Sequence, residues 1–546
     1  VLGRSFPADL LDAVVDEPVD DEVPQRLARF LEWEDGTIRF THALLRESSY
    51  DGLPYRLRRE LHARAGDAII ARSEDPEEQA GLLSLHFLHA QRYPEAYRFS
   101  LTAATRAARA FADVESVGFY ERAVDAARQL PDLGSAELAA LFESLADARY
   151  RAGLYGPAET AYRRARRLRS GDPVAEARVL LKLGRLQGWL DCYPRALRWI
   201  SRALRALDGV EGVDAVRQRA HVLAWYGRFC QEEGRHKRAM QWCERAVAEA
   251  TPVEEKEALA NALKVLDWAR MDLGLLHDPS DWHRALQLFE EIGDSPSAAS
   301  MLNFLGGFAY WRGQWTEALD YYRQAQETVH RTGNAVMDAF CRNNIAEIAL
   351  DQGRLDESER LLREALAIWR AAGYRSVIAS ATCNLARLAA GRGAFDEALR
   401  QFQEAESLAD HVGGQAEVRE IRARTAECLL LAGDPDAAIA MAEGCLEQLR
   451  TSDGVPPQKP LLERVRGVVL FTRGAVDEAM SALQASLDSA RTRDARYEEA
   501  LTLRAMADMG RSSGLGDGEE WESTSDTILE TLGVEWTPRL VPRTAA

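Results

Sequence analysis

The chain has 546 residues with a formal net charge of −18, and 46% of its residues are hydrophobic. It is too long for a single globular core, and its acidic balance argues against nucleic-acid binding, which needs a basic face. No run of about 18 apolar residues could cross a bilayer, and the first residues do not have the pattern of a signal segment.

The first 75 residues predict two short helices followed by a β-hairpin. The stretches VLGRSFPADLLDAVV and DDEVPQRLARFL are predicted to be the helices. LEWEDGTIRFTH is predicted to be the hairpin, because Asp35–Gly36 suits a two-residue turn and Ile38 and Phe40 alternate after it. Two helices and a small hairpin are a winged-helix arrangement. Two further helices, broken at Gly52–Pro54, are expected to follow.

Most of the remaining chain repeats one pattern. NNIAEIALDQGRLDES, which ends at Ser358, returns 40 residues later as CNLARLAAGRGAFDEA. In each copy a small residue precedes a glycine by seven positions, a large apolar residue follows it by nine and an alanine by twelve. This spacing predicts helical hairpins that pack closely through small residues, with a turn glycine ending the first helix. The turn glycines in register are Gly313, Gly353, Gly393, Gly433 and Gly474.

Such hairpins cannot bury their apolar faces alone, so they are expected to stack. We expect degenerate, connecting repeats over residues 76–135, the regular array over 136–510, and a C-terminal tail with one short helix over 511–546. The unit DLGLLHDPSDWHRALQLF is expected to carry extra residues between its helices. The predicted fold class is all-α.

The repeats resemble the tetratricopeptide repeat. Leucine–glycine pairs in the first helix occur at Leu183–Gly184 and Leu305–Gly306, and the turn pattern occurs at Gly313-x-Trp315-x-x-Ala318. The repeats here are longer than the usual length of about 34 residues. The resemblance implies a superhelical solenoid with a concave groove that binds a partner.

The N-terminal part is similar to the segment that follows the nucleotide-binding core in bacterial STAND-class signalling ATPases. It is most similar to actinobacterial proteins in which a class III adenylate/guanylate cyclase precedes the ATPase and a repeat array follows it. The resemblance implies that cyclase and ATPase modules lie upstream of Val1, and that the winged helix acts inside the ATPase. The residues that carry it are Phe40, His42, Leu45, Arg46, Tyr50, Leu53, Arg58, Leu61, His62, His86, Tyr93, Ala96, Ala103, Ala104, Ala107 and Tyr120.

No catalytic site is predicted in this chain. There is no GxxxxGK[ST] phosphate loop and no HExxH motif, so no cofactor is expected. His86 and His89 are spaced to share a helical face, but without further ligands nearby we interpret them as core or surface residues rather than a metal site. The seven scattered cysteines form no CxxC pair, which is typical of the cytoplasm.

The recurring asparagines indicate a candidate groove. In peptide-binding tetratricopeptide arrays, asparagine at this position bonds the ligand backbone through its amide, and neighbouring aromatic and charged residues would extend the surface. The alternative is that these asparagines bond the neighbouring helix and that the aromatic rings pack between repeats. The predicted groove residues are Asn303, Asn343, Asn344, Asn384, Arg387, Glu347, Phe340, Tyr310, Trp311, Trp225 and Arg228.

The resemblance therefore implies that the chain is the sensing arm of a cytoplasmic STAND-type signalling ATPase. A protein, peptide or small-molecule inducer would bind the groove, change how the array packs on its own upstream ATPase module, and so control an output domain, with self-association on activation. Neither nucleic acid nor membrane is an expected partner. Two alternatives remain open: an oligomerisation scaffold without an inducer, and the sensor arm of a transcriptional regulator.

Overall fold

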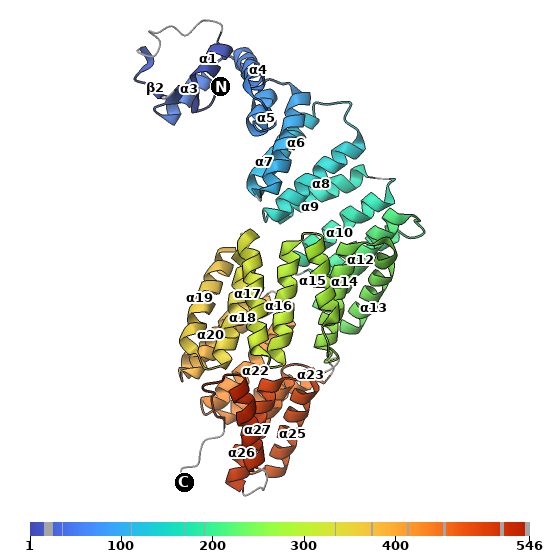
Figure 1. Ribbon diagram of the computed structural model, residues 1–546, viewed down its shortest axis with the longest axis vertical. Coiled ribbons are helices and arrows are strands. Elements are labelled where there is room, and N and C mark those ends of the chain that lie inside the picture. Colours follow the sequence, from blue (N-terminus) through green and yellow to red (C-terminus); the bar gives the residue numbers. More distant parts are fainter. Residues whose placement is uncertain are drawn as a thin grey trace. The chain divides into compact units, whose positions relative to one another are not determined.

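A computed structural model describes residues 1–15, 26–34, 36–110, 112–169, 171–190, 192–332, 335–372, 375–411, 414–450, 455–513 and 518–540. Within these ranges the regular structure is helical apart from one three-stranded sheet, which confirms the predicted all-α class. The chain forms two compact units (Figure 1). Unit 1 comprises residues 1–190 and 198–210, and unit 2 comprises residues 191–197 and 211–546. No helix in the described ranges is both long and apolar enough to cross a membrane.

Unit 1 begins with an antiparallel sheet of order β1-β3-β2. Its strands are β1 (Ser5–Pro7), β2 (Leu31–Glu34) and β3 (Thr37–Phe40). The predicted hairpin between β2 and β3 is confirmed, because Glu34 pairs with Thr37 across its turn. Asp35 of the predicted turn lies outside the described residues.

Strand β1 corrects the expectation of a helix through the first 15 residues. Phe6 pairs with Ile38 of β3, and both side chains are buried, so the sheet uses the apolar residue that a helix would have used. Helix α1 (Ala8–Val14) begins only after Pro7, which has no amide hydrogen to offer and suits a helix start. Half of the second predicted helix, residues 20–25, lies outside the described residues. In its other half only residues 26–27 are helical, and its last residue, Leu31, begins β2.

The remaining helices of unit 1 follow the sheet, and from the helix that begins at Tyr55 to the one that begins at Pro173 each packs against the next. The predicted break at Gly52–Pro54 is confirmed, because it separates the first two of them. Their bounds are α3 (Ala43–Asp51), α4 (Tyr55–Arg72), α5 (Ala80–His89), α6 (Tyr93–Arg109), α7 (Asp113–Ala127), α8 (Ser135–Arg151), α9 (Tyr155–Leu168) and α10 (Pro173–Trp189), and α11 (Tyr193–Ala206) is divided between the units.

Unit 2 is a series of helical hairpins in which each even-numbered helix pairs with the helix that follows it. Its helices are α12 (Val213–Glu232), α13 (His236–Ala250), α14 (Lys256–Asp272), α15 (Ser280–Glu291), α16 (Ser295–Trp311), α17 (Trp315–Thr332), α18 (Ala335–Asp351), α19 (Leu355–Ala372), α20 (Arg375–Gly391), α21 (Phe395–His411), α22 (Gln415–Leu431), α23 (Pro435–Leu449), α24 (Lys459–Thr472), α25 (Val476–Thr492), α26 (Arg496–Ser513) and α27 (Gly518–Thr531), with a short 3-10 turn, η1 (Thr251–Val253), after α13.

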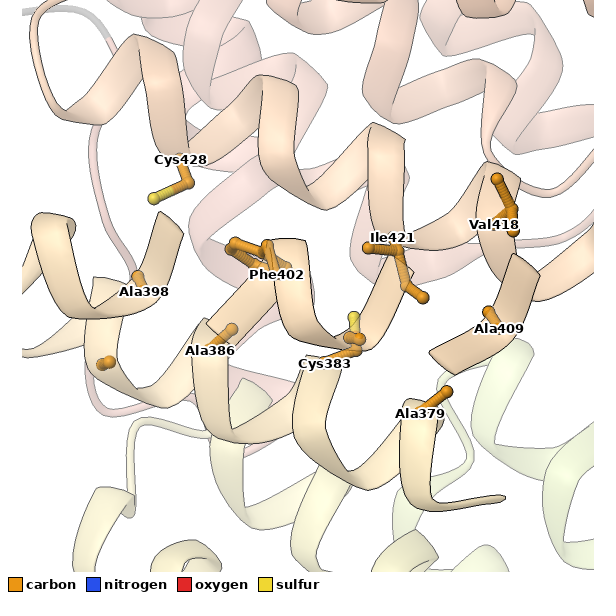
Figure 2. Close-up of a cluster of buried hydrophobic side chains, with 11 residues drawn as sticks. Ala379, Cys383, Ala386, Ala398, Phe402, Ala409, Val418, Ile421 and Cys428 are labelled. Atoms are coloured by element: carbon orange, nitrogen blue, oxygen red, sulfur yellow. The ribbon is translucent and has the colours of Figure 1, made fainter. Parts of the chain in front are cut away.

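The small and large residues of the repeat pattern form the contacts between these helices. Figure 2 shows Ala386 of α20 and Ala398 of α21 in one buried cluster, with Phe402 of α21 between them and α22. Ile421 of α22 belongs to the same cluster, so the apolar face of this hairpin is buried partly by the next one. This is the stacking that the sequence pattern predicts.

A turn glycine ends the first helix of each regular hairpin, as expected. Gly353 and Gly393 have φ angles of +86° and +76°, a conformation that strains any residue with a Cβ. The irregular unit is also confirmed, because residues 273–279 separate α14 from α15, whereas residues 352–354 separate α18 from α19.

Another glycine lies inside the first helix, where the two helices of a hairpin touch. A Cβ at Gly306 of α16 would lie 2.5 Å from the Tyr322 ring of α17, whereas one at Gly307 would meet nothing closer than 3.9 Å. We expect Gly306→Ala to destabilise unit 2 by about 1–3 kcal/mol through overpacking. Gly307→Ala should stabilise it by up to about 1 kcal/mol through helix propensity. Urea unfolding measures both, and equal effects would contradict this packing.

The first helices of successive hairpins also touch one another. Contacts join α16 to α18, α18 to α20, α20 to α22, α22 to α24, and α24 to α26. Together these six helices form one continuous surface, which we call the inner wall. The predicted groove asparagines all lie on its first three helices.

Candidate partner-binding site

The inner wall curves, so that its last helix, α26, lies close to α18 and to the turn after α16. The Tyr497 hydroxyl of α26 donates to the Asp351 carbonyl of α18 over 3.3 Å, and the ring centroids of Tyr497 and Trp315 lie 5.3 Å apart. The Arg312 guanidinium, just after α16, bonds Asp494, just before α26, at 2.8 Å. These hydrogen bonds join residues 146 and 182 positions apart in the sequence. The wall therefore encloses a space.

Charged side chains of neighbouring hairpins pair across the wall. Arg387 of α20 donates to Asp351 at 2.6 Å and to Glu347 at 3.2 Å, both on α18. Burial raises the pKa of Glu347, and the Arg387 charge opposes that rise. Tyr310 of α16 joins the same cluster by donating its hydroxyl to the Asp351 carboxylate at 2.5 Å. Burial, followed by the charge of Asp351, raises the pKa of Tyr310 well above its usual value.

A second charged cluster lies further along the wall. Arg464 of α24 donates to Glu498 of α26 at 2.6 Å, and only 1% of the Arg464 side chain is exposed. Nη1 of Arg424 on α22 is 3.9 Å from Glu498 and 3.7 Å from Glu427. Burial alone would raise the pKa of Glu498, but the Arg464 and Arg424 guanidiniums outweigh it and hold that pKa below its usual value. The wall therefore presents fixed charges of both signs.

The predicted asparagines form amide contacts on the same wall. The Asn344 amide donates to Asn303 of the preceding hairpin at 2.8 Å, and the Asn343 amide donates to Asn344 at 3.3 Å. Asn384 accepts a hydrogen bond from Arg387 at 3.1 Å. The Asn344–Asn303 bond is the contact to a neighbouring helix that the alternative interpretation expected. A role of these amides in partner binding stays a prediction.

The other predicted residues make mainly aromatic contacts, and the ring of Trp311 lies edge-on to that of Tyr310 with centroids 5.6 Å apart. Trp311 lines a smaller cavity of about 40 Å³. Phe340 of α18 packs edge-on against Trp369 of α19, with ring centroids 5.0 Å apart, which is packing within a hairpin. Trp225 and Arg228 lie together on α12, where the guanidinium carbon is 5.3 Å from the ring centroid. Helix α12 does not belong to the inner wall.

A cavity of about 80 Å³ lies against the inner wall, enough for several water molecules. Helices α18 to α26 supply one side of its lining, and residues 536–540 supply part of the other. Apolar side chains, among them Phe402 and Leu431, complete it. A cavity that combines charged and apolar groups is suited to a ligand with both kinds of surface. Its charged lining residues are Asp351, Arg387, Arg424, Glu427, Arg464, Arg504, Asp508 and Arg539.

Sequence reasoning missed several of these residues. Arg424 and Arg464 stand 40 and 80 positions after Asn384, so extending the repeat register would have found both. Trp536, which lines the cavity, lies beyond the repeats, and no sequence pattern marks it.

Histidines form a separate cluster in unit 1. Nδ1 of His62 lies 3.0 Å from Nδ1 of His86, and the ring of His89 stacks on that of His62 with centroids 4.7 Å apart. Tyr50 places its hydroxyl 3.0 Å from Nε2 of His62. His86 is 1% exposed, which agrees with its interpretation as a core residue. In the part of the chain that the structure describes, no group of three or more His, Cys, Asp or Glu side chains is arranged to hold a metal ion.

Comparison with protein families supports the repeat assignment. The family described as tetratricopeptide repeat matches residues 297–371 and 338–411, which span α16 to α21. A comparison with curated proteins gives no match. The fold is thus an all-α tetratricopeptide-repeat array, with the matched hairpins at the start of the inner wall.

Solved structures that are similar to this chain include the following three. A Rap protein complexed with Competence and Sporulation Factor is 13% identical over 74% of this chain and 99% of its own, with a TM-score of 0.37. A STAND protein with a tetratricopeptide repeat sensor from Pyrococcus horikoshii is 12% identical over 88% of this chain and 62% of its own, with a TM-score of 0.32. BtubC from P. vanneervenii is 16% identical over 44% of this chain and 96% of its own, with a TM-score of 0.29.

Proposed function

We propose that this chain is the sensing arm of a cytoplasmic STAND-type signalling ATPase, and that a protein, peptide or small inducer binds the inner wall of unit 2. One observation carries the proposal: five helices from α18 to α26 direct fixed charges of both signs toward one cavity. Groups held in place by their neighbours can recognise a polar ligand without first being ordered. A stack of hairpins that needed only to hold its shape could have filled this space with apolar side chains.

A ligand can change the array only if it binds one arrangement better than another. The contact between Tyr497 of α26 and Asp351 of α18 offers two such arrangements, because it is either made or broken. In the proposed mechanism, a ligand that enters between these helices favours the broken contact. The change in curvature is then passed along the hairpins toward the N-terminal part of the chain.

The output rests on the resemblance of residues 38–125 to STAND ATPases. We propose that residues 1–75 form the winged-helix end of the ATPase module, that residues 76–135 connect it to the array, and that an upstream class III nucleotide cyclase responds. The sheet order β1-β3-β2 beside α1 supports the winged helix. The gene sequence that precedes the codon for Val1 tests the proposal, since a regulator with another output domain there would contradict it.

The asparagines provide the test of partner binding. We expect the double variant Asn344→Ala/Asn384→Ala to lose capture of a partner from cell lysate, because each change removes an amide that a peptide backbone can bond. Its stability should stay within about 1 kcal/mol per lost hydrogen bond. Affinity capture followed by mass spectrometry, with urea unfolding of the same variants, measures both quantities.

Gln324→Ala is the matched control, since Gln324 is an exposed amide on α17, outside the inner wall. It should capture the partner as the parent chain does. Capture that persists in the double variant, or unfolding of that variant, would remove the asparagines from the proposal. Light scattering addresses the scaffold alternative, because a mass that does not change with concentration argues against self-association.

A further inference from the structure

Residues 532–540, which follow α27, lie along the inner wall without forming a helix or a strand. We call residues 532–540 the C-terminal segment. Gln352, in the turn between α18 and α19, holds this segment through two hydrogen bonds: its side-chain amide donates to the Leu532 carbonyl at 2.8 Å, and its own carbonyl accepts from the Glu535 amide at 2.9 Å. Backbone bonding of this kind is how proteins hold peptide ligands.

The C-terminal segment packs against two glycines, Gly353 and Gly391. A Cβ at Gly353 would lie 3.0 Å from the Trp536 carbonyl oxygen and 3.1 Å from its amide nitrogen, so the peptide backbone approaches as closely as only glycine allows. The Trp536 ring reaches over Gly391, where a Cβ would lie 3.7 Å away. Gly393, the turn glycine of the next hairpin, has the same positive φ but nothing within 4 Å of its Cβ position.

The segment also makes one charged contact and leaves part of its site unfilled. Arg539 bonds the Asp508 carboxylate of α26 at 3.2 Å. Trp536 remains 48% exposed although it lines the cavity, and about 80 Å³ stays empty beside it. A ligand with the same contacts and a better fit to that space would therefore bind more favourably than the segment does.

We propose that the C-terminal segment is an internal ligand of the inner wall, and that the external partner is a peptide of the same chemistry. Such a peptide presents a backbone amide to the Gln352 carbonyl, an aromatic ring to the Gly353 and Gly391 surface, and an arginine to Asp508 three residues later. The inference rests on the proposed function and names its ligand class. A tethered segment competes at a high effective concentration, so the partner binds only by displacing it.

A labelled peptide with the sequence LGVEWTPRL, that of residues 532–540, tests this with the full chain. We expect it to bind the Trp536→Ala chain about tenfold more tightly than the parent chain, because the tethered competitor is weakened. Adding Gly353→Ala to that variant should abolish binding, since its Cβ occupies the peptide's place. Adding Gly393→Ala, which brings the same backbone strain at an open position, should leave the affinity within about twofold. Fluorescence anisotropy reports the affinities, and circular dichroism checks that each variant is helical.

Two results would overturn the proposal: equal affinity for the parent and the Trp536→Ala chain, or binding that survives Gly353→Ala. A further measurement uses only the parent chain, so its result does not depend on whether the variants fold. Excess unlabelled peptide should speed hydrogen exchange at the Glu535 amide, and an unchanged rate would also overturn the proposal. The two proposals fail separately. If the peptide does not bind but partner capture still depends on Asn344 and Asn384, the sensing function stands and the internal ligand falls.

Discussion

Replacing Arg464 by methionine is expected to remove about 3–5 kcal/mol from the free energy of unfolding of unit 2. Arg464 is 1% exposed and bonds Glu498 at 2.6 Å, so its loss leaves a buried carboxylate without its strongest partner. Arg424, at 3.9 Å, is too distant to replace that bond. Urea unfolding followed by far-ultraviolet circular dichroism measures the change.

Two further variants show whether the cause is the unpaired charge. In Arg464→Met/Glu498→Gln both charges are gone, and we expect a coupling free energy of at least about 2 kcal/mol in favour of the double variant. Arg450→Met removes an exposed partner of Glu447, with side chains 75% and 71% exposed, and should change stability by less than about 1 kcal/mol. Additive losses in the double variant would mean that packing, rather than charge, makes Arg464 important.

Acidification is expected to loosen α4 and α5 of unit 1. Burial lowers the pKa of His62 to about 3 and that of His86 to about 4, whereas an unfolded histidine titrates near 6.5. Below pH 6.5 the unfolded state therefore binds protons that the folded state does not, so the free energy of unfolding decreases as the pH is lowered. At pH 5 each histidine costs about 2 kcal/mol. Hydrogen exchange at Ala65 and Phe87, corrected for the intrinsic rate, should show a loss of about 4 kcal/mol between pH 7 and pH 5.

The readout must be local, because two carboxyl groups of unit 2 respond in the opposite direction. Burial raises the pKa of Asp267 and Asp272 to about 6, so acidification favours their folded state. The variant His62→Gln/His86→Gln should remove most of the loss in α4 and α5. His283→Gln, which replaces an exposed histidine of unit 2, should leave it in place. A pH dependence that persists without His62 and His86 would assign it to other groups.

The hairpin packing could be predicted because spacing alone determines it. Ala386 and Phe402 occupy fixed positions relative to Gly393, and a helix of 3.6 residues per turn brings such positions to one face. Strand β1 could not be predicted from local pattern, since Phe6 and Pro7 suit a helix start as well as a strand. Pairing with Ile38, more than 30 residues away in the sequence, makes this segment a strand.

The candidate site was predictable only in part. The position of Asn344 in the repeat placed it on the inner wall, but whether its amide meets a ligand or Asn303 depends on the distance between hairpins, which no local pattern sets. Tyr497 meets Asp351, and Trp536 meets Gly353, because the array curves back on itself. Curvature accumulates from small rotations between repeats, so contacts of this kind need the folded structure.

The return of α26 to α18 has a consequence for how unit 2 comes apart. An open stack of repeats has only nearest-neighbour contacts, so it frays from its ends and melts in stages. Here the bonds from Tyr497 to Asp351 and from Arg312 to Asp494 tie distant hairpins together. The terminal hairpin, α26–α27, cannot unfold separately until those bonds break. Once they break, the neighbouring hairpins lose packing contacts on two sides. Unit 2 should therefore melt more cooperatively than a linear stack of the same length, and separating α26 from α18 would return it to stepwise melting.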